Sequence, residues 1–265
     1  MRVYRKRQSN LYQPGSRNPF RISRSKIDLF LQCPRCFYLD RRLGLGRPGM
    51  PAFSLNSTVD ALFKKEFDLL RKKGEAHGLM KKYGIEAIPF AHPQLPVWRD
   101  DMYAYVGACV LHQPTNLEIC GIVDDLWINK ARELLVVDYK ATSTNKEISL
   151  DDEYKQSYKK QAEVYQWIFR QLKFEVSDTA YFVFANASRN HPSFDGLLQF
   201  ELSIISYQGD DSWVEKTLVE IKNCLEGDKI PQSFNDCEHC GYRKLACEQE
   251  SLGKNKDSPY QEKLI

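Results

Sequence analysis

The stretch Leu134-Leu135-Val136-Val137-Asp138-Tyr139-Lys140 places four apolar residues directly before an alternation of Asp, Tyr and Lys. An apolar run of this kind is typical of a central strand that is covered by helices on both faces. Because side chains alternate along a strand, Asp138 and Lys140 share one face and Tyr139 lies on the other. The stretch therefore predicts an α/β fold whose central strand ends in a charged pair.

Two further strands are expected upstream, over residues 103–111 and 117–128, with polar turns that make the three strands a meander. The second of these strands carries Asp124. If it pairs with the central strand, the carboxylates of Asp124 and Asp138 converge at one edge of the sheet. Two hard oxygen ligands beside the ammonium of Lys140 suit Mg²⁺ or Mn²⁺ next to a phosphate.

Helices are expected where apolar residues recur every three to four positions. One of them, over residues 152–172, places Gln161 and Tyr165 on one face, four residues apart. Another begins near Ser25 and ends at the Cys33-Pro34 break. The remaining expected elements are helices over 57–73 and 211–225 and strands over 179–185 and 197–205.

The composition is that of an ordinary globular protein, with 42% hydrophobic and 28% charged residues among 265. We expect a basic flexible arm over 1–24, one domain over 25–250 and a flexible tail over 251–265. No apolar run approaches the length of a membrane span, and the basic N-terminus lacks the apolar segment of a signal peptide. These features predict a cytoplasmic protein.

The net charge of +3 does not indicate a nucleic-acid partner by itself, but the charge is uneven. Residues 1–26 carry eight Lys or Arg and no acid. Such an arm can neutralise phosphates and release counterions, and a solvated tail is the alternative interpretation.

Taken together, these motifs resemble the PD-(D/E)xK nuclease superfamily, and within it the RecB-like branch that includes CRISPR-associated exonucleases and the AddB nuclease domain. The resemblance implies a restriction-endonuclease-like core, a central mixed β-sheet flanked by helices. It further implies that Asp124, Asp138 and the backbone carbonyl of Tyr139 bind the catalytic metal, and that Lys140 orients or activates the attacking water. The implied catalytic set is Asp124, Asp138, Lys140, Gln161 and Tyr165.

One position departs from the family pattern. Many relatives place a metal-binding His on the first core helix, in a Gly-x-x-x-His pattern, where this chain has Asn56-Ser57-Thr58-Val59-Asp60. Asp60 is an oxygen donor that can replace the imidazole as a metal ligand and favours a hard cation. The alternative is a solvent-facing Asp at the start of a helix. Glu66 and His77 are weaker candidates for the same role.

Eight cysteines without a secretion signal argue against disulfides and for metal or cluster ligation. The pattern resembles that of iron–sulfur RecB-like nucleases, which implies a [4Fe–4S] cluster on Cys33, Cys237, Cys240 and Cys247. The gap before Cys247 is one residue longer than the family spacing, and Cys36 is an extra thiol.

Two alternatives to the iron–sulfur cluster remain open. Cys33, Cys36, Cys237 and Cys240 form two C-x₂-C knuckles that suit a structural Zn²⁺. With no metal, Cys36 and Cys247 would be packed thiols. In either metal case the expected role is to join distant segments. The remaining cysteines, Cys109, Cys120 and Cys224, are expected to be buried as small hydrophobic residues.

The predicted function is that of a Mg²⁺- or Mn²⁺-dependent deoxyribonuclease, an exonuclease in DNA repair, recombination or defence. The alternative is a catalytically weak DNA-binding subunit of a larger repair complex with the same fold. A redox role for Cys33-x-x-Cys36 is disfavoured, because the motif follows a short helix instead of a strand. No nucleotide-binding Gly-x-x-x-x-Gly-Lys-Ser/Thr loop is present, so ATP is not expected as a ligand and any helicase would be a partner.

Overall fold

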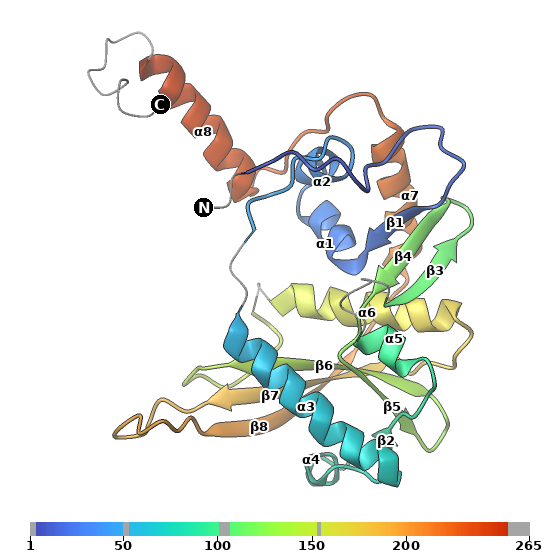
Figure 1. Ribbon diagram of the computed structural model, residues 1–265, viewed down its shortest axis with the longest axis vertical. Helices are drawn as coiled ribbons and strands as arrows, with labels where there is room; N and C mark the ends of the chain where they lie inside the picture. The colour runs from blue at the N-terminus through green and yellow to red at the C-terminus, as the bar shows by residue number, and fades with distance from the viewer. Residues whose placement is uncertain (1–3, 50–52, 101–106, 153–154, 254–265) are drawn as a thin grey trace. The chain divides into compact units, whose positions relative to one another are not determined.

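The computed structural model describes residues 4–49, 53–100, 107–152 and 155–253 (Figure 1). The chain divides into two compact units. Unit 1 comprises Met1–Ser16, Leu29–Gly49 and Ile221–Ile265, and unit 2 comprises Arg17–Asp28 and Met50–Glu220. Within the described residues, no helix is both long enough and apolar enough to cross a bilayer.

A five-stranded mixed sheet forms the centre of unit 2, in the order β2-β5-β6-β7-β8. Its central strand, β6 (Leu134–Thr142), pairs antiparallel with β5 and parallel with β7, so the prediction of a central strand is confirmed. The parallel pair requires a crossover, which α6 (Gln156–Gln171) provides. The other strands are β2 (Ala87–Pro89), β5 (Asp125–Asn129), β7 (Thr179–Ala187) and β8 (Phe200–Gln208).

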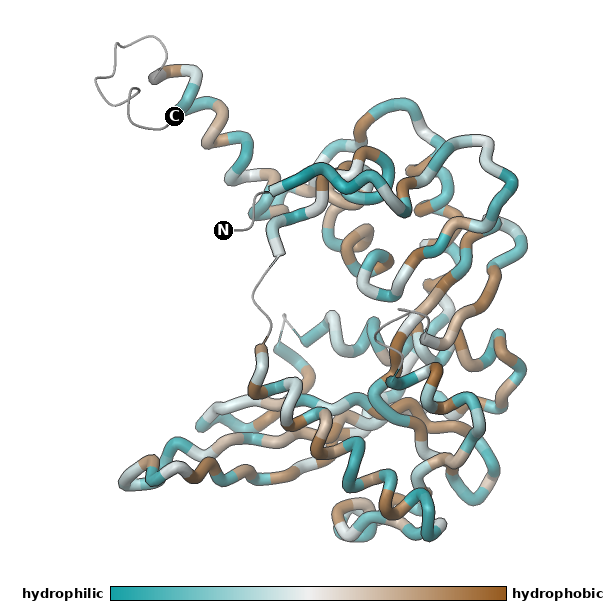
Figure 2. Tube along the Cα trace, in the orientation of Figure 1, coloured by the Kyte–Doolittle hydropathy of each residue, from teal (hydrophilic) through white to brown (hydrophobic). Residues whose placement is uncertain are grey.

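Helices cover this sheet on opposite faces (Figure 1). On one face, α3 (Ser54–Lys73) stacks Phe63 on Tyr139, with ring centroids 4.9 Å apart. On the other face, α6 contributes the amide of Gln161, which contacts Asp138. Figure 2 shows hydrophobic segments along the strands and an alternation of hydrophobic and hydrophilic residues along α3, as expected of a helix with one face on a core. The α/β class and the mixed sheet flanked by helices are thus confirmed.

The strand that was predicted over 117–128 is in fact two strands, in two different sheets. β4 (Leu117–Gly121) belongs to a three-stranded sheet, with β1 (Phe20–Ser23) parallel on one side and β3 (Ala108–His112) antiparallel on the other. The chain leaves this sheet after Gly121 because backbone groups there bond elsewhere: the carbonyl of Trp98 accepts from the Val123 N–H at 3.1 Å. The predicted strand over 103–111 begins at residues that lie outside the described ranges.

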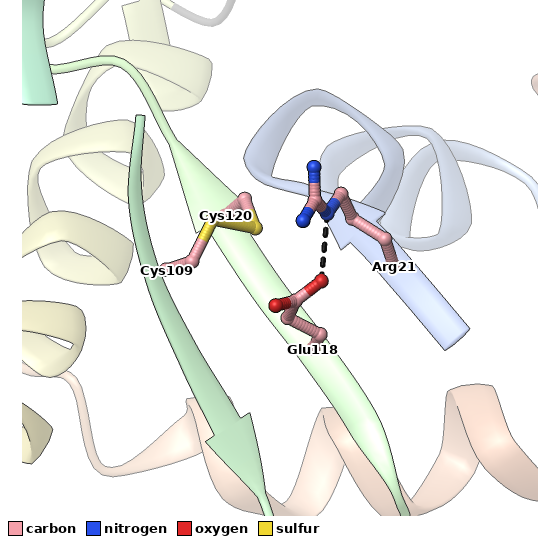
Figure 3. The surroundings of a disulfide bond; sticks show 4 residues. All are labelled: Arg21, Cys109, Glu118 and Cys120. Carbon is pink, nitrogen blue, oxygen red and sulfur yellow. Dashed lines mark hydrogen bonds and ion pairs between the residues drawn. A yellow bond between two sulfur atoms is a disulfide. The ribbon is translucent and has the colours of Figure 1, made fainter. Parts of the chain in front are cut away.

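Cys109 and Cys120 form a disulfide, which corrects the prediction that both are unpaired hydrophobic side chains (Figure 3). They lie directly opposite each other on β3 and β4, with their Cα atoms 4.2 Å apart. This closeness is a property of opposed residues in an antiparallel pair. On the neighbouring strand β1, Arg21 donates from Nε to Glu118 at 2.7 Å.

The N-terminal segment differs from the flexible arm that was expected. The side chain of Tyr12 is buried, and residues 20–23 form β1. Two small helices and one 3-residue strand between α3 and β3 were also not predicted. These elements are α4 (Gly78–Lys82), α5 (Leu95–Arg99) and β2.

Four helices supply the described structure around the cysteines and the C-terminal segment. They are α1 (Arg24–Gln32), α2 (Pro34–Arg41), α7 (Trp213–Glu226) and α8 (Glu238–Gly253). Pro34 begins α2 as well as following α1, because proline is tolerated at the first position of a helix. α8 was not predicted, and it continues past the expected end of the domain at residue 250.

Candidate active site

The carboxylates of Asp124 and Asp138 are brought together by the pairing of β5 with β6. Asp125 lies opposite Val137, so the next position along the ladder sets Asp124 against Asp138. Oδ2 of Asp124 accepts a hydrogen bond of 2.9 Å from the Tyr139 backbone N–H. Burial and the neighbouring Asp138 raise the pKa of Asp124 to about 7, because both oppose its ionisation. A cation bound beside the two carboxylates would favour the ionised form of Asp124.

Asp138 is buried on β6 and is held by two partners on the α6 side of the sheet. Gln161 donates from Nε2 to Oδ1 of Asp138 at 2.8 Å, and the ammonium of Lys140 forms an ion pair with Oδ2. Burial lowers the pKa of Lys140, but the charges of Asp138 and Asp124 outweigh this effect and raise it. Lys140 is consequently a cation, and its Nζ lies 4.3 Å from the centre of the Tyr158 ring.

The side chain of Tyr139 points to the opposite face, as the strand period predicts. Its hydroxyl donates to Oδ2 of Asp125 at 2.7 Å. The other carboxylate oxygen of Asp125 forms an ion pair with Arg71 of α3. This buried network anchors β5 and β6 to α3 and takes no part in the cluster around Asp138.

Gly121 and Tyr165 fit together closely. The Tyr165 hydroxyl donates to the carbonyl oxygen of Ile122 at 2.6 Å. A Cβ atom at position 121 would lie 2.4 Å from Cε1 of the Tyr165 ring, so only glycine leaves room for it. This contact explains the glycine three residues before Asp124, and it holds the segment that carries this carboxylate.

Asp60 opens onto the same cavity as Asp124. The cavity measures about 350 Å³ and is lined by Asp124, just before β5, and by residues of α3, β6 and α6 that include Asp60, Lys140 and Tyr158. Oδ2 of Asp60 pairs with Lys64 at 2.9 Å, whereas Oδ1 is buried without a hydrogen-bond partner among the described residues. Burial and the charge of Asp124 raise the pKa of Asp60. Asp60 is thus a suitable further oxygen donor.

Glu66 and His77, the weaker metal candidates, contact each other instead of this cavity. Nε2 of His77 lies 2.9 Å from Oε1 of Glu66, and Nδ1 accepts from the Leu79 backbone N–H at the start of α4.

The donor set of the cavity fits a divalent cation. Carboxylate oxygens are the ligands that Mg²⁺ and Mn²⁺ prefer, and the unpartnered oxygen of Asp60 and the raised pKa of Asp124 are both relieved by a bound cation. Within the described residues, the carboxylates of Asp60, Asp124 and Asp138 do not all lie within 4.8 Å of one another. Asp138 is turned toward Gln161 and Lys140, which accounts for its separation.

The model of one protein family, the PD-(D/E)XK nuclease superfamily, matches residues 55–247. The chain belongs to this superfamily. Members of the PD-(D/E)XK superfamily are usually nucleases and generally use divalent metals, which agrees with the carboxylates and lysine assembled at the end of β6. A search of curated proteins finds no match. Among solved structures, "Crystal structure of SSO0001" matches with 14% identity over 88% of this chain and 87% of that one, at a TM-score of 0.39.

In this PD-(D/E)XK chain, a second cluster is formed by cysteines of unit 1. The thiols of Cys33, Cys36, Cys237 and Cys240 all lie within 4.8 Å of one another and join the N- and C-terminal segments. Cys247, which the iron–sulfur pattern implied as a ligand, is exposed and outside this group, and Cys36 takes part instead. Cys224 is half-buried and also lies outside the group.

The cysteine thiols compete for ionisation. Burial raises the pKa of Cys33, but hydrogen bonds from the backbone N–H groups of Cys36 and Phe234 outweigh it and lower the value to about 7. Burial raises the pKa of Cys240 to about 12, and its contacts with Cys36 and Cys237 add to this. Because neighbouring thiolates repel one another, only a bound cation lets all four ionise together.

Three residues near the carboxylates were not singled out from the sequence. Lys64 is four residues after Asp60, a helical spacing that indicates the ion pair. Tyr158 faces Lys140 from α6. Arg24, which was assigned to the basic arm, lines a cavity of about 290 Å³ together with Gly121 and Tyr165.

Proposed function

We propose that this chain is a Mg²⁺- or Mn²⁺-dependent deoxyribonuclease that hydrolyses phosphodiester bonds. The observation that carries the proposal is the contact of buried Asp138 with both Lys140 and Gln161, next to Asp124, which directly precedes β5. Asp138 is 1% exposed, and unlike the buried Asp125 it contacts Lys140, which lines the cavity shared by Asp60 and Asp124. Burying a charge is costly, and it is retained where it serves a purpose such as catalysis.

The proposed metal ligands are Asp124, Asp138 and the backbone carbonyl of Tyr139, with Asp60 as a further ligand. When bound, the metal lowers the pKa of a water molecule and offsets charge that develops on the phosphate. Gln161 fixes the orientation of Asp138 through its hydrogen bond. Lys140, held by Asp138 and the Tyr158 ring, orients the attacking water and stabilises the negative charge on the phosphate oxygens.

The motif pattern of the sequence also supports a proposal for the branch of the superfamily, the type of cleavage and the partner. We place the chain in the RecB-like branch, with an exonuclease activity in DNA repair, recombination or defence, and with a helicase or another repair subunit as the partner that would supply unwinding. The basic residues of the N-terminal segment, including Arg24 beside Tyr165, offer contacts for DNA phosphates. Tyr165 and Gln161 are proposed to help form the site and contact the substrate.

The experiment is digestion of 5′- and 3′-labelled single-stranded, duplex and circular DNA, with Mg²⁺, with Mn²⁺ and with a chelator. We expect metal-dependent cleavage of linear DNA, and cleaved circles would show endonuclease action instead of exonuclease action. Asp138→Asn keeps the size of the side chain but removes its charge, and we expect it to abolish cleavage. A folded Asp138→Asn protein that cleaves like the wild type would contradict the proposal.

A further inference from the structure

The clustered cysteines of unit 1 are spaced as ligands of a single tetrahedral ion. The sulfur of Cys36 lies 3.7 Å from that of Cys237 and 3.6 Å from that of Cys240, and Cys33 lies 3.9 Å from Cys240. Four thiolates around one Zn²⁺, with metal–sulfur bonds of about 2.3 Å, lie about 3.8 Å from one another. The observed distances match this value. They do not single out one pair of sulfurs, as a disulfide would.

An iron–sulfur cluster does not fit these residues. In a [4Fe–4S] cluster the four thiolates bind four different irons, so the body of the cluster keeps their sulfurs farther apart than ligands of one ion. The implied fourth ligand, Cys247, lies on α8 with Cys240. Seven residues along a helix correspond to about 10 Å of rise, which carries Cys247 two turns away from the other thiols.

Each C-x₂-C pair is placed at the start of a helix. Cys33 is the N-cap of α2, and its carbonyl accepts from the Phe37 N–H at 3.1 Å. Cys237 directly precedes α8, and its carbonyl accepts from the Gly241 N–H at 2.9 Å. The backbone N–H groups at a helix N-terminus favour negative charge nearby. The start of each helix therefore favours a thiolate at Cys33 and at Cys237, and Cys33 also receives N–H donors from Cys36 and Phe234.

The guanidinium of Arg47 lies beside the cysteines and offsets the negative charge of a four-thiolate site. Four thiolates and one divalent ion leave a net charge of two negative units. Nη2 of Arg47 lies 3.6 Å from the sulfur of Cys237, and its Nη1 donates to Gln32 at 2.7 Å, which fixes the guanidinium in place. Three of the four thiols are buried, so this neutralisation takes place away from water.

We propose that Cys33, Cys36, Cys237 and Cys240 bind one structural Zn²⁺, with Cys247 as a free thiol outside the site. The ion joins the N-terminal knuckle at the start of α2 to the C-terminal knuckle at the start of α8. The zinc site is independent of the proposed nuclease activity, because none of the four cysteines belongs to the carboxylate cluster of unit 2.

The test is the metal content of the full chain, purified anaerobically from cells supplied with both zinc and iron. We expect one zinc and no iron per chain in the wild type and in Cys247→Ser, and loss of zinc in Cys36→Ser. An iron–sulfur cluster on Cys33, Cys237, Cys240 and Cys247 would instead give iron in the wild type and in Cys36→Ser, and loss of iron in Cys247→Ser. Cys36→His serves as a rescue, since an imidazole can replace a thiolate on zinc, and we expect it to retain the ion.

A second measurement covers the case in which Cys36→Ser does not fold. Co²⁺ added to zinc-depleted wild-type protein should give the intense visible absorption of tetrahedral cobalt with four thiolates, unchanged in Cys247→Ser. Iron in the anaerobically purified wild type, a disulfide-linked protein without metal, or loss of zinc in a folded Cys247→Ser chain would each overturn the proposal.

Discussion

Gln161 of α6 donates a hydrogen bond of 2.8 Å to Asp138 of β6, and the two residues are 23 positions apart in the sequence. This contact connects the crossover helix to the strand that carries the charged pair. It fixes one carboxylate oxygen of Asp138, while Lys140 contacts the other. The orientation of the proposed metal ligand is therefore set by two neighbours of different chemistry.

Replacing Gln161 tests this positioning role. Gln161→Ala removes the donor, so Asp138 can rotate, and we expect metal affinity or cleavage to fall about 10–100-fold, the usual cost of losing a partner behind a metal ligand. Gln161→Glu keeps the size but places a second carboxylate beside Asp138, and we expect a loss of at least the same size. The measurement is the Mn²⁺ dependence of the cleavage rate, with Gln156→Ala at the exposed start of α6 as the control. A Gln161→Ala protein with wild-type metal dependence would rule the role out.

The raised pKa of Asp124 predicts how the stability of the metal-free protein changes with pH. Its folded pKa of about 7 exceeds the ordinary value of about 3.9, so the folded chain binds the proton more tightly than the unfolded chain. Stability of the metal-free chain should therefore fall as pH rises from about 4 to about 7. Asp124→Asn removes this dependence.

Thermal melts of the metal-free proteins at pH 5 and pH 8 check this expectation. We expect Asp124→Asn to melt higher than the wild type at pH 8 and at a similar temperature at pH 5. For the wild type, metal affinity should also weaken below about pH 7, by about tenfold per pH unit, because the metal must displace one proton. Equal effects of the substitution at both pH values would show that the charge of Asp124 is not the cause.

The close packing of Gly121 against Tyr165 makes another testable contact. Gly121→Ala would place a methyl group 2.4 Å from the Tyr165 ring, and we expect about 1–3 kcal/mol of destabilisation together with reduced cleavage. Gly78→Ala is the matched control, because a Cβ atom there meets nothing within 4 Å. Denaturant unfolding of both variants gives the comparison, and equal stabilities would contradict the packing argument.

Side chains on the two faces of β6 should differ in their effects: Tyr139 on one face should affect stability, whereas Asp138 and Lys140 on the other should affect cleavage. Tyr139→Phe removes the hydroxyl that donates to buried Asp125, and we expect a loss of about 1–3 kcal/mol in the free energy of unfolding with cleavage close to wild type. The backbone carbonyl of residue 139, the proposed metal ligand, is unaffected by this change. Unfolding and cleavage are measured on the same preparation. An inactive but fully stable Tyr139→Phe protein would place the hydroxyl in the site instead.

The sequence predicts the centre of the five-stranded sheet well, because its signals are local. The apolar run before Asp138 identifies β6, and strand alternation assigns Asp138 and Lys140 to one face and Tyr139 to the other. The pairing of β5 with β6 is likewise confirmed. The roles of these residues in catalysis stay predictions.

Other features depend on contacts between distant segments. The break between β4 and β5 follows from bonds to Trp98 and Tyr165, which no local pattern reveals. Whether Cys36 or Cys247 joins the other cysteines depends on α8, whose helical course carries Cys247 away. The disulfide between Cys109 and Cys120 is an exception, because it follows from local geometry. A hairpin turn near residue 114 sets these two residues opposite each other.

The most direct test of the central claim is the single-turnover rate of DNA cleavage by Lys140→Met under saturating Mn²⁺. Methionine keeps much of the length of the side chain but removes the ammonium that contacts Asp138. Lys216→Met, an exposed lysine of α7, is the matched control. We predict a loss of about 10²–10³-fold for Lys140→Met and none for the control, the scale expected when one charged group that stabilises a transition state is removed. Equal rates for the two folded variants would contradict the account.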